Sequence, residues 1–226
     1  MTESKLPACI GIILDGNRRW AKERGVPSFE GHRQGAERVA ETARLVRDRG
    51  IPHLAIYAFS TENWERPDEE VSYLMKLFRT MAGEVFSKLA DERIRIRFVG
   101  QRERFDASMQ SLMRDVEQKS AQNSALTLWV CLSYGGRAEI VAAANSAATE
   151  GNVTEASLTS HLWTADMPNV DIIIRTGGEK RLSGFLTWRS VYAELFFVDA
   201  YWPDFSELIL DSILTEYAQR ERRMGT

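Results

Sequence analysis

The apolar stretch CIGIIL at residues 9–14 runs directly into the polar stretch DGNRRW at residues 15–20. A short run rich in isoleucine and closed by a glycine-containing polar cluster is typical of a buried strand that ends in a loop. Five further runs have the length and composition of buried strands: His53–Phe59, Ile94–Val99, Leu126–Leu132, Val170–Ile174 and Val191–Val198.

Segments with helical spacing of apolar residues separate most of these runs. One covers about Gln34–Arg49, and the other covers about Glu69–Ala90. Strands that alternate with helices imply right-handed crossovers and a parallel sheet. We therefore predict an α/β fold with a six-stranded, mainly parallel sheet and surrounding helices, in a single domain over residues 1–226.

Composition and charge limit the classes of function. The chain has 226 residues and a net charge of -3, which argues against a non-specific nucleic-acid binder. Cys9 and Cys131 lie in apolar runs without a metal-ligand partner at short spacing, so we expect neither a disulfide nor a zinc site, and a cytoplasmic location. Residues 1–7 lack the features of a signal peptide, and the run at residues 8–14 is too short to cross a bilayer.

Polar and glycine-rich clusters follow most of the predicted strands. After residues 15–20, the next clusters are STENWERP at 60–67, Gly100, SYGGR at 133–137 and RTGGE at 175–179. Because the carboxyl ends of parallel strands meet at one edge of a sheet, where ligands bind, these clusters are expected to form a single cleft.

The predicted cleft combines cationic and acidic side chains. Arginine forks suit phosphate oxygens, and Asp15 and Glu194 offer the hard oxygen ligands that Mg²⁺ prefers. The sequence lacks a P-loop, a dinucleotide-binding glycine motif after a strand, and a G-x-S-x-G nucleophile motif. The residues alone therefore predict a Mg²⁺–diphosphate site, and its arginines are Arg18, Arg19, Arg66, Arg175 and Arg181.

Five motifs, in order along nearly the whole chain, resemble those of the cis-prenyltransferases, the undecaprenyl diphosphate synthase family. They are DGNRRWA (15–21), GHRQG (31–35), YAFSTENW (57–64) with Arg66-Pro67, RTGGE (175–179) with Arg181, Ser183, Phe185 and Trp188, and YAEL (192–195) with Trp202-Pro203. The resemblance implies a Mg²⁺-dependent prenyltransferase. Such an enzyme condenses isopentenyl diphosphate with an allylic diphosphate (dimethylallyl, geranyl or farnesyl) into a cis-polyprenyl diphosphate.

The resemblance also implies roles for individual residues. Asp15 would hold Mg²⁺ with Glu194 completing the metal site, and Asn63 would help to remove the proton from isopentenyl diphosphate. The allylic diphosphate would be bound by Gly16, Asn17, Arg18 and Arg19, with Trp20 and His32 shaping that site. The isopentenyl diphosphate would be bound by Arg175, Arg181 and Ser183, and further substrate contacts would come from Ser60, Thr61, Glu62, Trp64, Arg66 and Leu182.

The C-terminal residues Arg223 and Gly225 match a tail that, in the family, reaches across a dimer to the isopentenyl diphosphate. The resemblance therefore implies a homodimer with complete sites, and a peripheral contact with membranes as the product leaves. Ser28 and Lys180 are two of the positions that depart from the family pattern. Ser28 replaces a frequent arginine, and Lys180 replaces a frequent histidine, which makes a metal contact at position 180 doubtful because a protonated lysine does not ligate Mg²⁺.

Product length and two alternative functions remain open at this point. The apolar stripe at residues 69–89 is expected to line a tunnel for the growing chain, and the bulky Met81 on it leads us to expect a product shorter than undecaprenyl. One alternative is a lavandulyl-type condensation of two allylic diphosphates, a branch that tends to lose the Glu-Asn-Trp pattern retained at residues 62–64. The other is a non-catalytic subunit, which the retained motif residues oppose.

Overall fold

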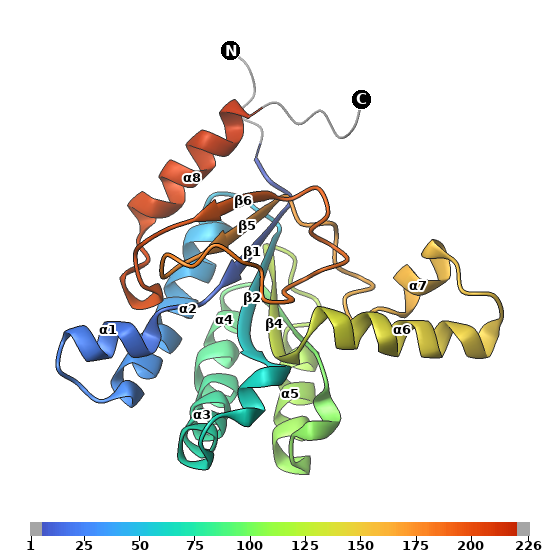
Figure 1. Cartoon of the computed structure of the whole chain (residues 1–226), viewed down its shortest axis with the longest axis horizontal. Coiled ribbons are helices and arrows are strands. Elements are labelled where there is room, and N and C mark those ends of the chain that lie inside the picture. The colour runs from blue at the N-terminus through green and yellow to red at the C-terminus, as the bar shows by residue number, and fades with distance from the viewer. Residues whose placement is uncertain (1–5, 221–226) are drawn as a thin grey trace.

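The predicted strands form one sheet in the middle of the molecule (Figure 1). The computed structural model describes residues 6–220. The strand order is β3-β4-β2-β1-β5-β6, and every neighbouring pair is parallel. The predicted α/β fold is confirmed, with a sheet that is wholly parallel. The strands are β1 (Cys9–Ile13), β2 (His53–Ser60), β3 (Ile94–Val99), β4 (Leu126–Tyr134), β5 (Ile172–Arg175) and β6 (Glu194–Phe197).

Helices and short helical turns connect the strands. The predicted helix Gln34–Arg49 is the later part of a longer helix that starts at Ser28, directly after Pro27. The predicted helix Glu69–Ala90 is a continuous rod with a π-helical segment at its middle. The helices are α1 (Asn17–Glu23), α2 (Ser28–Asp48), α3 (Asp68–Thr80), α4 (Ser87–Asp91), α5 (Ala107–Lys119), α6 (Gly136–Glu150), α7 (Glu155–His161) and α8 (Glu207–Gln219). The shorter segments are η1 (Thr61–Glu65), η2 (Met81–Phe86, the π-helical part), η3 (Arg102–Arg104) and η4 (Trp202–Asp204).

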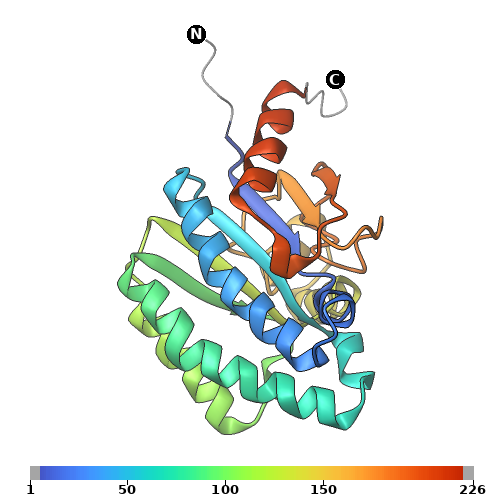
Figure 2. The ribbon, with the colours of Figure 1, turned by 90° about the vertical axis from the view of Figure 1, so that its left-hand side faces the viewer.

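The sheet separates two unequal apolar cores. The larger core joins one face of the sheet to α2, α3, α4, α5 and α8, and Figure 2 shows the long helices lying along that face. The smaller core lies on the other face, under the loops that precede β5 and β6. Both faces of β1 are covered, because all five of its residues are buried, as expected for a central parallel strand.

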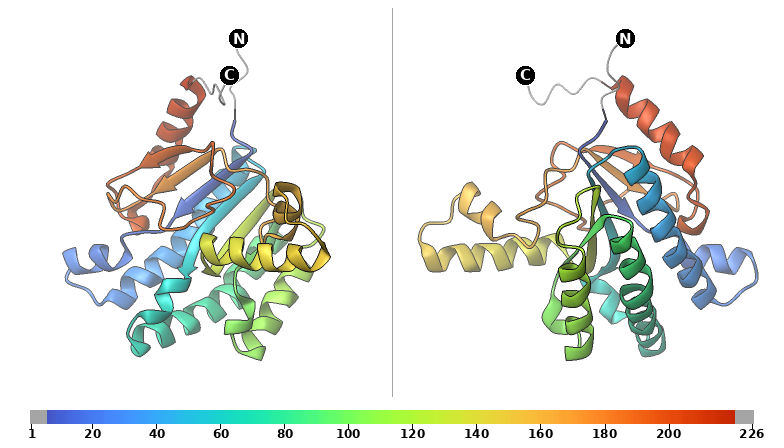
Figure 3. Two further views of the ribbon diagram at one scale, coloured as in Figure 1. Left: turned by 45° about the vertical axis from the view of Figure 1, so that its right-hand side comes forward. Right: turned by 180° about the vertical axis from the view of Figure 1, so that it is seen from behind.

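Helices α6 and α7 extend away from the sheet as an arm (Figures 1 and 3). The predicted loop at residues 151–154 joins them, and Thr154 caps α7 by accepting the main-chain N–H of Ser157 at 3.1 Å. Across residues 6–220, no helix is both long enough and apolar enough to cross a lipid bilayer.

Candidate active site

A cavity of about 450 Å³ opens at the carboxyl ends of β1, β2 and β5. Its lining combines charged side chains with apolar ones from the ends of β1 and β2 and from α3. The structure thus brings together most of the residues that the sequence predicted. These are Asp15, Gly16, Asn17, Arg18, Arg19, His32, Ser60, Asn63, Arg66, Arg175, Arg181 and Ser183.

Asp15 follows β1, and its carboxylate accepts hydrogen bonds from two arginines. Oδ2 accepts from Arg175 Nη2 at 2.8 Å, and Oδ1 accepts from Arg19 Nη2 at 3.1 Å. Partial burial opposes ionisation, but the hydrogen bond and charge of Arg175, helped by Arg19, outweigh it and hold the pKa of Asp15 below its ordinary value. Asp15 is therefore an anion at neutral pH.

Arg175 is the last residue of β5 and is 4% exposed. Its Nη1 donates to the carbonyl oxygen of Arg181 at 2.5 Å and to Ser183 Oγ at 2.9 Å. With Asp15 on Nη2, this guanidinium ties the end of β1 to the loop after β5. Arg175 thus fixes the position of Arg181 and Ser183, whereas Arg181 itself keeps 59% of its side chain exposed and accessible to an anionic ligand.

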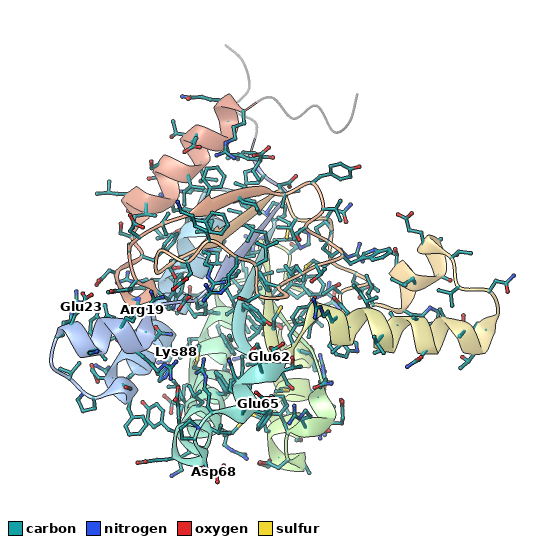
Figure 4. All side chains as sticks on the ribbon, in the orientation of Figure 1. Arg19, Glu23, Glu62, Glu65, Asp68 and Lys88 are labelled. Carbon is teal, nitrogen blue, oxygen red and sulfur yellow. The ribbon has the colours of Figure 1, made fainter. Side chains whose placement is uncertain are left out.

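Glu179 stands between two of the predicted diphosphate-binding arginines. One of its carboxylate oxygens lies 2.5 Å from Arg181 Nη1, and the other lies 3.6 Å from Arg19 Nη1. Figure 4 shows Arg19 extending from α1 toward the sheet. Glu179 also lines the cavity, so an anionic ligand that bound these two cations would have to compete with this carboxylate.

A second ionic cluster lies where α1, α2 and α3 meet. Glu70 accepts from Arg66 Nη1 at 3.0 Å, contacts His32 Nε2 at 3.2 Å, and lies 3.6 Å from Arg18 Nη1. Burial lowers the pKa of His32, although the charge of Glu70 opposes this. Glu70 was not predicted as a site residue, because in the sequence it is one acid of the run Asp68-Glu69-Glu70. It nevertheless contacts three residues that were predicted for the site.

Asn63 sits in η1, and its side chain is part of a helix cap. Asn63 Oδ1 accepts the main-chain N–H of Ser60 at 3.1 Å, while the Ser60 side chain accepts the main-chain N–H of Asn63. Because the amide oxygen is used in this way, the Nδ2 group is the part of Asn63 that remains to donate to a ligand. This favours an orienting role for Asn63 over a role as the base.

Other predicted site residues do not line the cavity. Trp20 Nε1 donates to Asp204 Oδ1 at 2.8 Å, and Trp64 Nε1 donates to Ser133 Oγ at 2.9 Å. Trp64 also packs against Phe59 and the larger core, so it anchors η1 rather than facing the cavity. Thr61 and Glu62 hydrogen-bond to each other in η1, where Figure 4 labels Glu62, and Leu182 packs on the smaller core.

Glu194 is not brought to Asp15 within one chain. It is the first residue of β6 and lies opposite Ile172, whereas the cavity is at the Arg175 end of the same strand pair. Three residues along a strand correspond to about 10 Å. Its carboxylate instead pairs with Arg220 Nη1 at 2.5 Å. Arg223 and Gly225 lie outside the described residues.

The apolar part of the lining was predicted only at Leu74, which belongs to the apolar stripe at residues 69–89, because its other residues read as ordinary core. It comprises Ile13, Leu14, Tyr57, Ala58 and Leu74. Tyr57 and Ala58 stand near the end of β2, and only the meeting of β2 with α3 shows that they line the cavity together with Leu74. Of the two variable positions, Ser28 is exposed at the start of α2, and Lys180 is exposed in the loop after β5.

Close packing of α1 on α2 determines the position of the first motif, residues 15–21. A Cβ atom on Gly31 would lie 2.0 Å from the carbonyl oxygen of Asn17, and one on Gly35 would lie 2.4 Å from Asn17 Oδ1. The two glycines are four residues apart and thus share one face of α2. They allow α1, with Arg18 and Arg19, to approach the cavity closely.

The donor groups present fit a magnesium ion that shares its coordination with substrate. Mg²⁺ is commonly held by one or two carboxylates plus substrate phosphates, and it keeps several waters. Within residues 6–220, no three His, Cys, Asp or Glu side chains are grouped as a metal cage. The anionic Asp15 at the cavity wall is the carboxylate that suits this shared mode of binding.

Comparisons with known proteins agree with this fold. The family described as "Putative undecaprenyl diphosphate synthase" matches residues 13–225. An isoprenyl transferase from Agrobacterium fabrum is 44% identical, over 99% of this chain and 94% of that protein. A ditrans,polycis-undecaprenyl-diphosphate synthase from Shewanella oneidensis, described as (2E,6E)-farnesyl-diphosphate specific, is 40% identical over 100% of this chain and 85% of that protein.

Two solved structures share the whole fold. Lavandulyl diphosphate synthase from Lavandula x intermedia, in complex with dimethylallyl diphosphate, has a TM-score of 0.93 at 31% identity, covering 98% of this chain and 99% of that chain. A probable undecaprenyl diphosphate synthase from Campylobacter jejuni has a TM-score of 0.84 at 29% identity, with the same coverage. The chain belongs to the undecaprenyl diphosphate synthase family. It is, accordingly, a prenyltransferase, and the family resemblance of its motifs is confirmed.

Proposed function

We propose that this prenyltransferase condenses isopentenyl diphosphate with an allylic diphosphate, in the presence of Mg²⁺, to make a cis-polyprenyl diphosphate. The observation that carries the proposal is a single cavity in which Asp15 and five arginines (Arg18, Arg19, Arg66, Arg175 and Arg181) lie beside an apolar wall. A prenyl diphosphate matches this arrangement, because its anionic head is joined to an apolar tail.

The reaction breaks the allylic carbon–oxygen bond and forms a carbon–carbon bond to the alkene of isopentenyl diphosphate. One proton then leaves to create the new double bond, and diphosphate is released. Arg18 and Arg19 act by stabilising the negative charge that develops on the leaving diphosphate. Magnesium, when bound through Asp15, supplies further positive charge to that leaving group.

Asn63 and Ser60 act on the proton-transfer side of the reaction. Asn63 is not basic, and its amide oxygen is already bonded to the Ser60 main chain. We infer that its Nδ2 group orients a phosphate oxygen or a water, and that this oxygen accepts the proton. Arg181 and Ser183, fixed by Arg175, are assigned to the diphosphate of isopentenyl diphosphate.

The first test is an assay of the purified full chain with Mg²⁺, labelled isopentenyl diphosphate, and dimethylallyl, geranyl or farnesyl diphosphate as separate starters. The expected result is a ladder of cis-linked products that disappears when the metal is chelated. A folded protein that incorporates no label with any starter would contradict the proposal, and it would favour the non-catalytic subunit.

A lavandulyl-type condensation is a second candidate, and the fold supports it. The TM-score of 0.93 to lavandulyl diphosphate synthase exceeds the 0.84 to the Campylobacter protein. Incubation with dimethylallyl diphosphate alone separates the two candidates. A branched product of two dimethylallyl units would establish the irregular reaction, whereas the proposed reaction requires isopentenyl diphosphate.

We also propose that the chain acts as a homodimer in the cytoplasm, with peripheral membrane contact during product release. Support for a dimer comes from the edge of the sheet at β6, where Leu195 is 38% exposed, and from Val191, which is 71% exposed in the turn just before β6. Apolar side chains on an edge strand invite a partner that covers them. A role for Glu194 in metal binding stays a prediction, and within the geometry of one chain it requires a second copy to bring that residue to a cavity.

A further inference from the structure

Tyr57 lies near the end of β2 and connects two parts of the cavity wall. It is 8% exposed, and its ring lines the cavity. Its hydroxyl donates toward the carbonyl oxygens of Tyr134 at 3.1 Å and Ser183 at 3.3 Å, and it also interacts with the Ser60 side chain. One phenol thus touches both the Ser60–Asn63 segment and the loop that carries Arg181 and Ser183.

That loop adopts a backbone that needs support from its surroundings. Ser183 has φ of 50° and Leu186 has φ of 47°, with Gly184 at 76° between them. Left-handed φ values at non-glycine residues are costly and persist only where neighbouring groups hold them. The supports are the Tyr57 hydroxyl on the Ser183 carbonyl, the Tyr57 ring stacked at 4.8 Å on Phe185, and the Gly136 N–H on the Gly184 carbonyl at 2.8 Å.

We propose that Tyr57 is a positioning residue, whose hydroxyl holds the Ser183 loop in the form that binds the diphosphate of isopentenyl diphosphate. This inference rests on the proposed function, because it takes Arg181 and Ser183 as the binding groups for that substrate. Tyr57 acts through Ser183. Its proposed effect is on the isopentenyl diphosphate side of the cavity, and not on the allylic side, where Arg18 and Arg19 lie on α1.

The hydroxyl acts as a donor rather than as a base. Burial raises the pKa of Tyr57 well above its ordinary value, so the phenol keeps its proton at neutral pH. The ring contributes packing that a phenylalanine would preserve, and the hydroxyl alone contributes the bond to Ser183. The two contributions can therefore be separated by one substitution.

The test compares Tyr57→Phe with Tyr134→Phe. Both substitutions remove one buried phenolic hydroxyl from the same aromatic cluster, in which the two rings lie 5.9 Å apart. The Tyr134 hydroxyl donates to the buried Glu139 and does not reach the loop. KM for isopentenyl diphosphate, KM for the allylic starter and kcat are measured for each variant, together with the affinity for isopentenyl diphosphate alone by calorimetry and the melting temperature.

Tyr57→Phe is expected to raise the KM and the dissociation constant for isopentenyl diphosphate about tenfold, which is the effect of one lost hydrogen bond. Its KM for the allylic starter is expected to change less than about twofold on the same scale. Tyr134→Phe is expected to lose similar thermal stability and to keep both KM values. Equal effects of the two variants on isopentenyl diphosphate, in a wild-type protein that binds and uses it, would overturn the role of Tyr57. A wild-type protein that neither binds nor uses isopentenyl diphosphate would overturn the proposed function, and this inference with it.

Discussion

Arg175 and Arg19 stabilise the ionised form of the Asp15 carboxylate. The contribution of Asp15 to the stability of the fold therefore depends on pH. The folded-state pKa of Asp15 lies below its ordinary value of 3.8. A carboxyl group with a depressed folded pKa stabilises the protein fully above its unfolded pKa, and this contribution is lost as the pH falls through the folded pKa. Asp15 is therefore expected to stabilise the fold at neutral pH and to cease doing so in strong acid.

Asp15→Asn is predicted to lower turnover by about 10²- to 10³-fold, the range seen when one electrostatic group of an active site is removed. Because residue 15 can no longer ionise in this variant, its free energy of unfolding should also fall less than that of the wild type when the pH is lowered. Steady-state rates and urea unfolding at neutral and acidic pH measure the two effects. Asp204→Asn is the matched control, because Asp204 pairs with Arg24 at 3.1 Å outside the cavity. Equal rates for Asp15→Asn and wild type would contradict the assigned role.

Single residues of the site differ in how far they could be predicted. Asp15, Arg19 and Ser60 belong to polar clusters that follow strands, and the structure places them in one cavity. Trp20 and Trp64 belong to the same clusters, yet their indoles turn to Asp204 and Ser133. A motif identifies which residues are near the site, but the direction of each side chain depends on partners from distant segments.

At the scale of elements, the contact between α1 and α2 determines how close the first motif comes to the cavity. Gly31→Ala places a methyl group 2.0 Å from the Asn17 carbonyl oxygen, so the two helices must separate. We predict a loss of about 1–3 kcal/mol in the free energy of unfolding, as for other overpacked sites, together with weaker substrate binding.

Gly83→Ala is the matched control for this prediction. Gly83 lies in the π-helical segment, and a Cβ atom there would meet nothing within 4 Å. The same substitution should leave stability unchanged or raise it by about 0.4–1 kcal/mol. Chemical unfolding of both variants measures the difference, and equal stabilities would show that the α1–α2 contact tolerates a methyl group.

The rod of α3, η2 and α4 is the element that should limit product length. Leu74 lines the cavity, and Phe78 and Met81 follow it at positions i+4 and i+7 on the same buried face of the helix. A prenyl tail that enters beside Leu74 and extends along this face meets Phe78 and then Met81. Met81→Ala is therefore predicted to shift the products to longer chains, at a cost of about 2–5 kcal/mol in stability.

Product lengths are measured by chromatography of the released chains. Met167→Ala is the control, because Met167 is equally buried but belongs to the core on the other face of the sheet. It should cost similar stability without changing the product lengths. An unchanged distribution in Met81→Ala would show that the tail does not follow this helix face.

At the scale of the whole molecule, the exposed apolar edge at β6 predicts association of two chains. Val191→Asp is expected to weaken the dimer at least about tenfold, because an unpaired charge would be buried at the interface. Sedimentation measured over a range of protein concentrations tests this. Leu208→Asp is the control, since Leu208 is 81% exposed and belongs to α8 rather than to the segment that carries Val191 and Leu195. A wild-type protein that remains monomeric at all concentrations would refute the proposed homodimer.

The sequence by itself determined the strands, the parallel sheet and the cluster of residues at its carboxyl edge. These follow from local composition and from the rule that parallel strands end on the same side. Helix boundaries were less predictable: α2 begins at Ser28 rather than near Gln34, and the low helix propensity of Gly31 hides this first part of the helix in the sequence.

Only the tertiary structure decided which of these residues act together. Glu194 belongs to a motif of the family, but it begins its strand and therefore lies at the far end of the sheet from Asp15. Glu70, Glu179 and Tyr57 join the site because their partners come from other elements. The physical reason is that composition and spacing act within one segment, whereas ionic pairs and hydrogen bonds across a cavity exist only after separate segments have packed.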